Sequence, residues 1–366
     1  MKVVSIIGAR PQFIKCAPVS RELRYVAREV LVHTGQHYDD GMSGVFFREL
    51  GIPEPDYNLG VGSGSHGQQT GEMLRKIEEI LLKEQPDVVL VYGDTNSTLA
   101  GSLAAAKLHV PVAHVEAGLR SFNRRMPEEI NRVMTDHLSD LLLCPTETAV
   151  GNLRREGVTT RVHLVGDVMY DALLDNVEGA KQMSTILDRL KLEPRRYLLA
   201  TVHRAENTDQ LPRLEGIMAA FSSLANSGWT IVFPVHPRTR KQLRKLSFDC
   251  PERLLMVDPV PYLDMVLLEA MAQLIATDSG GIQKEAQWLG VPCITLRQET
   301  EWIETVDSGW NRLVGTIPDH IVNAAYEARP GRSSSWPWSR GDASKSVARL
   351  VAQSRCDPLI DGWRTG

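Results

Sequence analysis

Short apolar runs rich in β-branched residues alternate with longer stretches of helical periodicity along almost the whole chain. Because the runs are nearly continuous in apolar residues, they are typical of parallel strands buried on both faces. The expected strands are VVSII (3–7), VLVHT (30–34), VVLVYG (88–93), VAHVE (112–116), LLLC (141–144), VHLVG (162–166), YLLATVH (197–203), TIVFPVH (230–236), LLMVD (254–258), LIATD (274–278) and CITL (293–296). The repeated alternation predicts an α/β fold with parallel sheets.

The strands divide into two series, and 366 residues are enough for two domains with full cores. We expect two doubly wound, Rossmann-like domains, the first at 1–168 and the second at 169–342. A long helical connector should lie at about 170–192, and a helix at about 343–366 should pack back onto the first domain. Ligands of open α/β sheets bind at the carboxyl ends of the strands. The active site is therefore expected in the cleft between the domains.

Polar side chains follow one expected strand after another. They are Arg10, Lys15, Asp94, Glu116, Arg120, His203, Arg204, His236, Arg238 and Asp278. Because parallel strands present their carboxyl ends at one edge of a sheet, we expect these side chains to face one cleft.

The stretch LIATDSGGIQKEAQWLG (274–290) reads as a strand, a tight turn and a helix. Gly280 and Gly281 would let the backbone approach an anion without a Cβ clash. Ser279 suits the N-cap, and the first N–H groups of the helix would be free to bind phosphate oxygen. Glu285 could accept two hydrogen bonds from a ribose diol. The alternative is a plain capped helix after a tight turn.

Charged residues near the other strand ends suggest both binding and acid–base chemistry. Arg10 and Lys15 could supply charge to a diphosphate, or could be solvated surface charges. Carboxylates placed near a histidine such as His203 can divide general acid and base work, although His203 could also be a satisfied strand-end residue. The carboxylate candidates are Asp94, Glu116 and the pair Glu128 and Glu129. The dipole of the helix that MPEEINR opens explains one glutamate of that pair, but not the carboxylates that end buried strands.

Composition, charge and cysteine spacing exclude several kinds of partner and cofactor. A net charge of −4 and a pI of about 6.2 give no broad basic field, so we expect no nucleic-acid partner. No apolar run reaches the length of a membrane span, and the N-terminus does not read as a signal peptide. The cysteines are scattered without a CxxC motif, which indicates reduced thiols of a cytoplasmic protein and no metal site. The sequence GSGSHG (62–67) matches G-x-G-x-x-G but follows no convincing strand, so we expect no nicotinamide cofactor.

The motifs GARPQFIK, HTGQHYD, VYGDTNSTLAG, HVEAGLRS, MPEEINR, TVHRAEN, PVHPRTR and TDSGGIQKEA stand in this order along nearly the whole chain. Together they closely resemble the non-hydrolysing UDP-N-acetylglucosamine 2-epimerase family. The resemblance implies a GT-B fold, a homodimer, and interconversion of UDP-GlcNAc and UDP-ManNAc for polysaccharide synthesis.

The resemblance also implies roles for individual residues. Arg10 and Lys15 would contact the diphosphate and sugar region. Diphosphate binding would fall to Ser279, Gly280 and Gly281, with ribose binding by Glu285. The positions that match the family's catalytic residues are Asp94, Glu116, Glu128 and His203, and His236 joins the substrate-binding set.

This residue set fits an elimination mechanism without a cofactor. The C2 hydrogen of the sugar is not acidic, since no carbonyl adjoins it, so a base must remove it while UDP departs from C1. Re-addition of UDP to the resulting 2-acetamidoglucal inverts C2. The alternatives are a hydrolysing epimerase, a GT-B glycosyltransferase and a non-catalytic nucleotide-sugar-binding protein.

Two stretches depart from the family pattern. QHYDDGMSG (36–44) stands where regulated members bind an activating substrate molecule, so we do not expect allosteric activation. Thr300, Glu301, Trp302, Ile303 and Glu304 stand where many members have Thr-Glu-Arg-Pro-Glu. The version with Trp302 also resembles epimerases of UDP-2,3-diacetamido-2,3-dideoxyglucuronic acid, which makes that sugar the alternative substrate.

Overall fold

The computed structural model describes residues 1–36, 50–246, 248, 250–332 and 341–354. The chain forms two compact units, with unit 1 at 1–174 and 337–366 and unit 2 at 175–336. The division falls inside a helix, α7 (Val168–Met183). All of the stretch QHYDDGMSG after Gln36, residues 333–340 and the residues beyond 354 lie outside the described part of the chain.

Unit 1 is built on a parallel sheet with the strand order β3-β2-β1-β4-β5-β6-β7 in the described part of the chain. Its strands are β1 (Lys2–Ile7), β2 (Arg28–His33), β3 (Tyr57–Asn58), β4 (Val88–Tyr92), β5 (Val112–Val115), β6 (Leu141–Cys144) and β7 (Val162–Leu164). The chain winds outward in both directions from β1. The point between β1 and β4 is therefore the topological switch point, where ligands of this kind of sheet bind.

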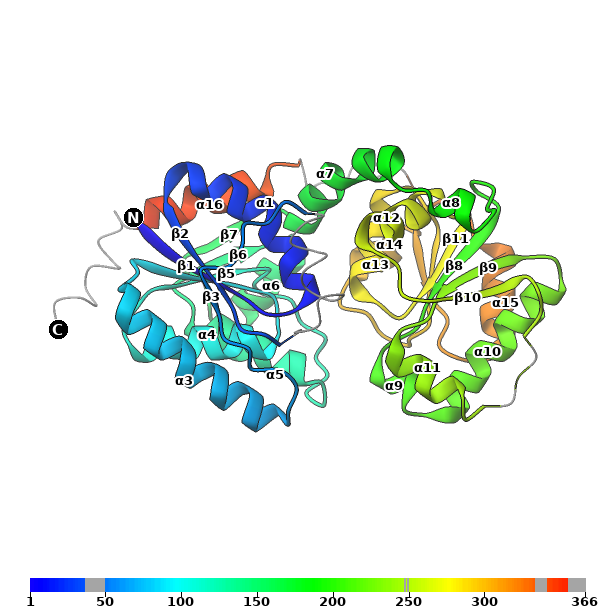
Figure 1. The fold of residues 1–366 in the computed structure, drawn as a ribbon, viewed down its shortest axis with the longest axis horizontal. Coiled ribbons are helices and arrows are strands. Elements are labelled where there is room, and N and C mark those ends of the chain that lie inside the picture. The colour runs from blue at the N-terminus through cyan, green and yellow to red at the C-terminus, as the bar shows by residue number, and fades with distance from the viewer. Residues whose placement is uncertain (37–49, 247, 249, 333–340, 355–366) are drawn as a thin grey trace. The chain divides into compact units, whose positions relative to one another are not determined.

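Helices cover both faces of the unit 1 sheet (Figure 1). They are α1 (Arg10–Val26), α3 (His66–Glu84), α4 (Asn96–Lys107), α5 (Pro127–Leu138), α6 (Glu147–Arg155) and α16 (Ala343–Gln353), and α7 begins in this unit. Helices α1 and α16 pack together, as do α3 and α4. Small residues let α4 approach the sheet closely, because a Cβ on Gly101 would lie only 2.8 Å from Ile6 Cδ1.

Unit 2 repeats the same winding, with the strand order β10-β9-β8-β11-β12-β13. Its strands are β8 (Tyr197–Thr201), β9 (Thr230–Pro234), β10 (Leu254–Val257), β11 (Leu274–Thr277), β12 (Cys293–Thr295) and β13 (Asn311–Leu313). The switch point lies between β8 and β11. Both strands are fully buried, which explains their nearly continuous apolar sequences.

The helices of unit 2 also lie on both faces of its sheet (Figure 1). They are α8 (Ile186–Arg189), α9 (Ala205–Thr208), α10 (Leu211–Asn226), α11 (Pro237–Leu243), α12 (Tyr262–Met271), α13 (Gly280–Trp288), α14 (Ile303–Asp307) and α15 (Pro318–Glu327). Apolar side chains of α10 and α15 share one core with alternate residues of the strands, such as Phe221 with Phe233.

The expected strands all form, with small differences in length. The structure adds β3 and β13, which the sequence pattern did not indicate. The helical connector expected at about 170–192 is divided into two helices, because α7 ends at Met183 and α8 follows. Helix α3 begins inside the GSGSHG stretch, where Ser65 provides its N-cap. Among the described residues, no helix is long and apolar enough to cross a membrane.

Candidate active site

The candidates of unit 1 gather at the carboxyl edge of its sheet, next to the switch point. Lys15 of α1 forms an ion pair with Glu116, which follows β5, and the two side chains are only 10% and 9% exposed. Gly93, which follows β4, lies against this pair: a Cβ there would sit 3.1 Å from Lys15 Nζ and 3.2 Å from Glu116 Oε2. A glycine at this position, with a φ of +63°, lets the two charges approach the end of the strand.

The backbone of Glu116 is in the left-handed region, with a φ of +73°. A residue other than glycine in this region costs on the order of 1–3 kcal/mol, and such residues cluster at active sites. The Leu143 carbonyl accepts the N–H groups of Glu116 and Ala117 at 3.0 and 3.2 Å. The fold therefore imposes this conformation, which no sequence pattern indicated.

We expect Glu116→Gly to unfold less easily than Glu116→Ala. Both substitutions remove the carboxylate that pairs with Lys15, so their difference reports the backbone alone. Glycine relieves the left-handed strain but makes the unfolded chain more flexible, which leaves a net advantage of about 0.5–1 kcal/mol. Urea denaturation of the two variants measures it. Greater stability of the alanine variant would show that the backbone is not strained.

Asp94 comes directly after Gly93 and has a 33% exposed side chain. Arg132 of α5 places one guanidinium nitrogen 2.5 Å from Asp94 Oδ2 and the other 2.7 Å from Glu129 Oε2. The amide of Asn131 donates a hydrogen bond to the Asp94 carbonyl at 2.9 Å. Helix α5 thus fixes both the main chain and the carboxylate of Asp94.

The neighbouring glutamates of MPEEINR have different environments. Glu129 is buried and accepts hydrogen bonds from the N–H groups of Ser121 and Phe122, both at 2.9 Å. It therefore holds the turn before α5. Glu128 is half-buried, and the structure assigns its carboxylate no partner among the described residues. Of the two, Glu128 has the carboxylate that the fold does not use.

The turn after β1 carries Arg10, Lys15 and a residue that the sequence reasoning missed. Arg10 opens α1, and Lys15 lies further along the same helix. The side chain of Gln12 accepts hydrogen bonds from Gly8 N at 2.8 Å and Ala9 N at 3.0 Å, and donates to the carbonyl that ends β4 at 2.9 Å. Gln12 therefore ties the two central strand ends together. Only its place in the motif GARPQFIK could have indicated this.

The candidates of unit 2 lie at the carboxyl edge of its own sheet. Asp278, at the end of β11, is fully buried and accepts the N–H groups of His203 and Arg204 at 3.0–3.1 Å. The amide of Asn207 adds a bond at 3.1 Å. The imidazole of His203 lies beside the same carboxylate, with Nδ1 3.3 Å from Oδ1, and its side chain is 41% exposed. Asp278 thus positions a histidine that solvent or a ligand can reach.

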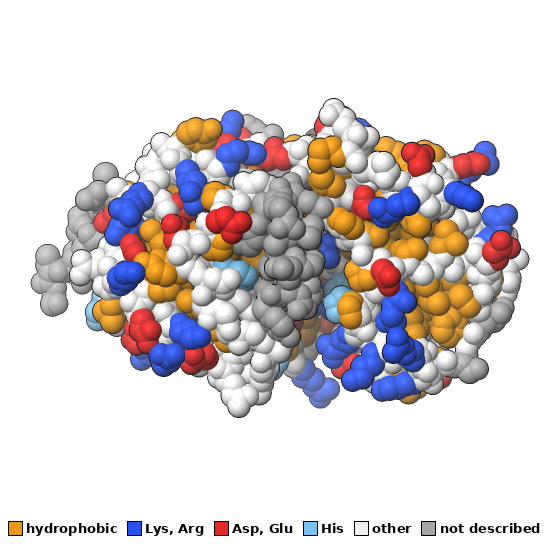
Figure 2. Space-filling view, in the orientation of Figure 1, with side chains coloured by type: hydrophobic (Ala, Val, Ile, Leu, Met, Phe, Trp, Pro, Cys, Tyr) orange, Lys and Arg blue, Asp and Glu red, His pale blue; other side chains and the backbone are white. Residues whose placement is uncertain are grey.

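His236 is close to His203, with ring centroids 6.3 Å apart. It is the N-cap of α11, and its Nδ1 accepts the Arg238 N–H at 3.2 Å. Lysines and arginines gather over α9 and α11, whereas acidic and basic side chains mix elsewhere on the visible face (Figure 2). Part of this positive charge is paired, since Arg238 lies 2.5 Å from Asp209.

The turn that opens α13 contains two glycines with different surroundings. A Cβ on Gly280 would collide with the Glu301 carboxylate and lie 3.2 Å from Trp302 Nε1, so internal packing already favours glycine there. A Cβ on Gly281 would meet only Ser279 Oγ, at 3.9 Å. Ser279 occupies the N-cap position, but its hydroxyl makes no capping bond in the described structure. Packing therefore does not explain Gly281, and the space beside it leaves room for a ligand to approach.

This contrast predicts that Gly280→Ala affects stability, whereas Gly281→Ala affects ligand binding. We expect Gly280→Ala to lose about 1–3 kcal/mol of stability through overpacking. We expect Gly281→Ala to keep the melting temperature of the ligand-free protein but to lose most of the increase that UDP produces. Thermal unfolding with and without UDP measures both. An undiminished UDP shift in Gly281→Ala would contradict an anion site at this turn.

Helix α13 continues with buried charges. Glu285, the expected ribose ligand, is buried. Lys284 is 2% exposed, and its Nζ lies 3.7 Å from the centroid of the Trp302 ring, which is itself 3% exposed. This cation–π contact holds the indole beside the Gly280 turn. Nothing in the sequence singled out Lys284.

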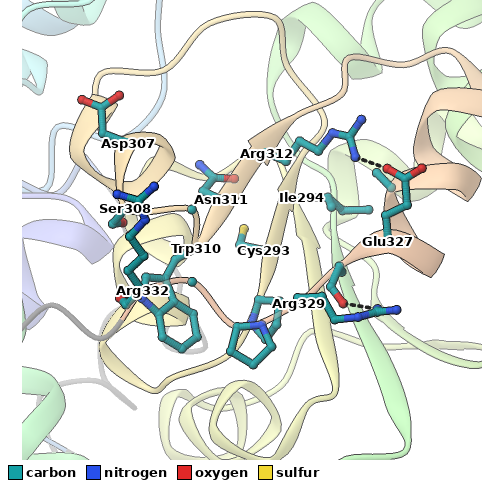
Figure 3. A pocket seen from close by; sticks show the side chains of 16 residues that line it. Cys293, Ile294, Asp307, Ser308, Trp310, Asn311, Arg312, Glu327, Arg329 and Arg332 are labelled. Carbon is teal, nitrogen blue, oxygen red and sulfur yellow. Dashed lines mark hydrogen bonds and ion pairs between the residues drawn. The ribbon is translucent and has the colours of Figure 1, made fainter.

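A cavity of about 350 Å³ lies in unit 2, but at the amino end of β12 and β13 (Figure 3). Arg312, Arg329 and Arg332 surround it together with Trp310. Arg312 lies 2.5 Å from Glu327, and Arg329 donates to main-chain carbonyls at the end of α15. These arginines stabilise the C-terminus of α15. The candidate residues lie at the opposite edge of the sheet, so we do not include this cavity in the site.

Comparison with known proteins supplies the family. A sequence model of UDP-N-acetylglucosamine 2-epimerase matches residues 21–352. The chain belongs to the UDP-N-acetylglucosamine 2-epimerase family. A relative from Methanococcus maripaludis described as a UDP-N-acetylglucosamine 2-epimerase homolog is 56% identical over 352 residues, which cover 95% of this chain and 98% of that protein. The UDP-2,3-diacetamido-2,3-dideoxy-D-glucuronate 2-epimerase of Pseudomonas aeruginosa is 48% identical over 360 residues, covering 96% and 100%.

A solved structure of this epimerase family is also similar. The crystal structure of Methanocaldococcus jannaschii UDP-GlcNAc 2-epimerase in complex with UDP-GlcNAc and UDP has a TM-score of 0.90 at 45% identity, covering 96% of this chain and 99% of that one. The predicted class of two doubly wound, GT-B-like domains is therefore confirmed. The family also confirms that the chain is a UDP-sugar 2-epimerase, an isomerase.

Proposed function

We propose that this member of the epimerase family interconverts UDP-GlcNAc and UDP-ManNAc without hydrolysing them. The observation that carries this proposal is the group of charges at the switch point of unit 1, where Lys15, Glu116 and Asp94 follow buried strands. The strained backbone of Glu116 adds to it, since strain of this kind persists where function needs it.

The proposed reaction is elimination followed by re-addition. A base removes the C2 proton while the C1–O bond to UDP breaks, which gives a 2-acetamidoglucal and UDP. UDP then adds back to C1, and a proton returns to C2 from the opposite face. We assign this acid–base work to Asp94, Glu116, Glu128 and His203. This route needs no redox cofactor, because the C2 hydrogen leaves and returns as a proton and no hydride is transferred.

The departing diphosphate requires positive charge and N–H donors. We assign this task to Arg10, Lys15 and the turn of Ser279, Gly280 and Gly281, where the N–H groups of the two glycines open α13. We assign the ribose to Glu285, and a further substrate contact to His236. The clearest support in unit 2 is Gly281, whose small size packing does not explain.

The test is incubation with UDP-GlcNAc in D₂O, without added cofactor, followed by NMR of the sugar. Deuterium at C2, formation of UDP-ManNAc and no steady release of UDP would support the non-hydrolysing reaction. Steady UDP release with free ManNAc would replace it by the hydrolysing reaction. Absence of exchange with this sugar would lead to the second candidate substrate.

The second candidate is UDP-2,3-diacetamido-2,3-dideoxyglucuronate, which would undergo the same chemistry. The Pseudomonas aeruginosa enzyme named for that sugar is 48% identical to this chain, whereas the Methanococcus maripaludis UDP-N-acetylglucosamine 2-epimerase is 44% identical. Trp302, which the sequence associated with this alternative, packs beside the Gly280 turn. Exchange at C2 of the diacetamido sugar, with no exchange at C2 of UDP-GlcNAc, would establish this second candidate as the substrate.

We further propose that the enzyme is a cytoplasmic homodimer. The described cysteines, Cys16, Cys144, Cys250 and Cys293, are free thiols, which suits a reducing compartment. Light scattering of the purified chain tests the dimer, and a monomeric mass at working concentration would refute it.

A further inference from the structure

His114 lies beneath the carboxylates of unit 1 and has no role in the proposed reaction. It stands on β5, two residues before Glu116, and its side chain is fully buried. Its Nδ1 lies 2.7 Å from Asp136 Oδ1, and its Nε2 lies 2.8 Å from the Gly93 carbonyl oxygen. Both ring nitrogens therefore face acceptors.

The partner carboxylate is ionised. Asp136 is fully buried on α5, and its second oxygen accepts the Gly118 N–H at 3.0 Å and an Arg120 N–H at 2.7 Å. Burial acts to raise the pKa of Asp136, but the hydrogen bonds and charges of His114 and Arg120 outweigh it and hold the pKa below its usual range. An ionised carboxylate donates no proton, so Nδ1 of His114 must donate.

The second ring nitrogen must donate as well. A carbonyl oxygen only accepts hydrogen bonds, so the contact with Gly93 requires a proton on Nε2. A histidine with protons on both nitrogens is an imidazolium. The structure thus contains a buried ion pair of His114 and Asp136, with Arg120 behind the carboxylate.

This ion pair controls two peptide groups that carry catalytic candidates. The Gly93 carbonyl belongs to the same planar peptide unit as the N–H of Asp94, so the bond from His114 fixes how Asp94 leaves the strand. Asp136 fixes the peptide N–H of Gly118, two residues after Glu116. One buried pair therefore holds the turns after both β4 and β5.

We propose that His114, protonated on both ring nitrogens and paired with Asp136, is the positioning residue that sets Asp94 and Glu116 for proton transfer. The inference rests on the proposed epimerase function. Misplacement of a reacting group by about 1 Å costs on the order of 10²-fold in rate, which is the loss expected without the pair.

Other charged or titratable groups around the pair do not compete for its role. Arg120 is held on its far side by Glu156 of α6, at 2.7 and 2.8 Å. The thiol of Cys144 on β6 faces Asp136, but burial raises the pKa of this thiol far above its ordinary value, so it stays neutral. Loss of the imidazole bond to the Gly93 carbonyl is therefore the change that would release the Gly93 turn.

The first measurement is NMR of the full-length chain labelled with ¹⁵N-histidine, near neutral pH. The chain has ten histidines, and loss of one signal in His114→Gln assigns the resonance. We expect a proton on both ring nitrogens of His114. A single protonated nitrogen near neutral pH would overturn the inference, whatever the variants do.

The second measurement compares Asp136→Asn with Asp140→Asn. Asp140 caps the amino end of the same strand, where it accepts the Val112 N–H at 3.0 Å, so its variant controls for loss of a strand-end carboxylate that holds a backbone N–H. We expect Asp136→Asn to lower kcat by about 10²-fold, with UDP affinity unchanged. Asp140→Asn should leave kcat unchanged.

The results separate this inference from the proposed function. Normal kcat in Asp136→Asn, with wild-type exchange intact, would overturn the positioning role alone. No C2 exchange by the wild type on either sugar would overturn the proposed function, and the positioning role with it.

His114→Gln keeps an N–H within reach of the Gly93 carbonyl, so it should retain more activity than His114→Leu. Equal loss in both would contradict the bond to Gly93.

Discussion

Asp94→Asn should abolish most of the exchange at C2 while leaving UDP binding intact. The substitution removes a charge but almost no volume, and the amide oxygen can still accept the hydrogen bond of Arg132. Arg132 also keeps Glu129, 2.7 Å away, so the fold loses little. General acid–base groups contribute about 10²–10⁴-fold to rate, and a loss of that size in kcat is expected. Deuterium incorporation measured by NMR gives the rate, and thermal shift with UDP gives the binding.

Asp258→Asn is the control for the chemical change itself, because that side chain is 87% exposed and pairs only at the surface with Arg240.

His203→Ala is a second, independent test of the site. The backbone N–H of His203, not its ring, makes the two 3.1 Å bonds to Asp278, so the turn should persist without the imidazole. Turnover should again disappear while UDP still binds. Unchanged turnover in both Asp94→Asn and His203→Ala would refute the proposed catalytic site.

The sheet architecture was predictable because buried parallel strands leave a strong signal. A run such as VVLVY has no charged or small polar residue, which indicates a fully buried strand, and it forms β4 as expected. The strands that the sequence did not indicate are edge strands. β3 has two residues and β13 has the sequence NRL, whose middle arginine is exposed. These two edge strands are short and keep polar residues, so they give no apolar run, whereas the edge strands β7 and β10 lie in the expected runs VHLVG and LLMVD.

Part of the site was predictable for a related reason. A charged residue directly after a buried strand, such as Asp94 or Glu116, has to lie at the sheet edge. The conformation of Glu116, the hydrogen bonds of Gln12 and the contact of Lys284 with Trp302 were not predictable. Each depends on a segment distant in sequence.

The two glycines of the α13 turn show the same limit. Phosphate approach was the expected reason for both, but Gly280 already has a reason within the protein, since its missing Cβ makes room for Glu301 and Trp302. A sequence records that a residue must be small, but not which neighbour requires it.

The second large effect is expected from substitutions of Glu128 and Glu129. One variant should lose stability and the other should lose activity. Glu129→Gln should lose about 3–5 kcal/mol of stability, the usual result of breaking one side of a buried ion pair. Its carboxylate joins Arg132 at 2.7 Å and holds the turn through the N–H groups of Ser121 and Phe122. Glu128→Gln should leave the free energy of unfolding within about 0.5 kcal/mol of wild type, since its half-buried carboxylate has no hydrogen-bond or ion-pair partner among the described residues.

Activity should follow the reverse order once both proteins are folded. If Glu128 does acid–base work, its amide variant should lose about 10²-fold or more in kcat with an unchanged melting temperature. Folded Glu129→Gln, assayed well below its melting temperature, should retain more activity. Urea denaturation and C2 exchange on the same preparations give both quantities. A stable Glu129→Gln, or an active Glu128→Gln, would show that the first turn of α5 divides its two carboxylates in the opposite way, with structure resting on Glu128 and chemistry on Glu129.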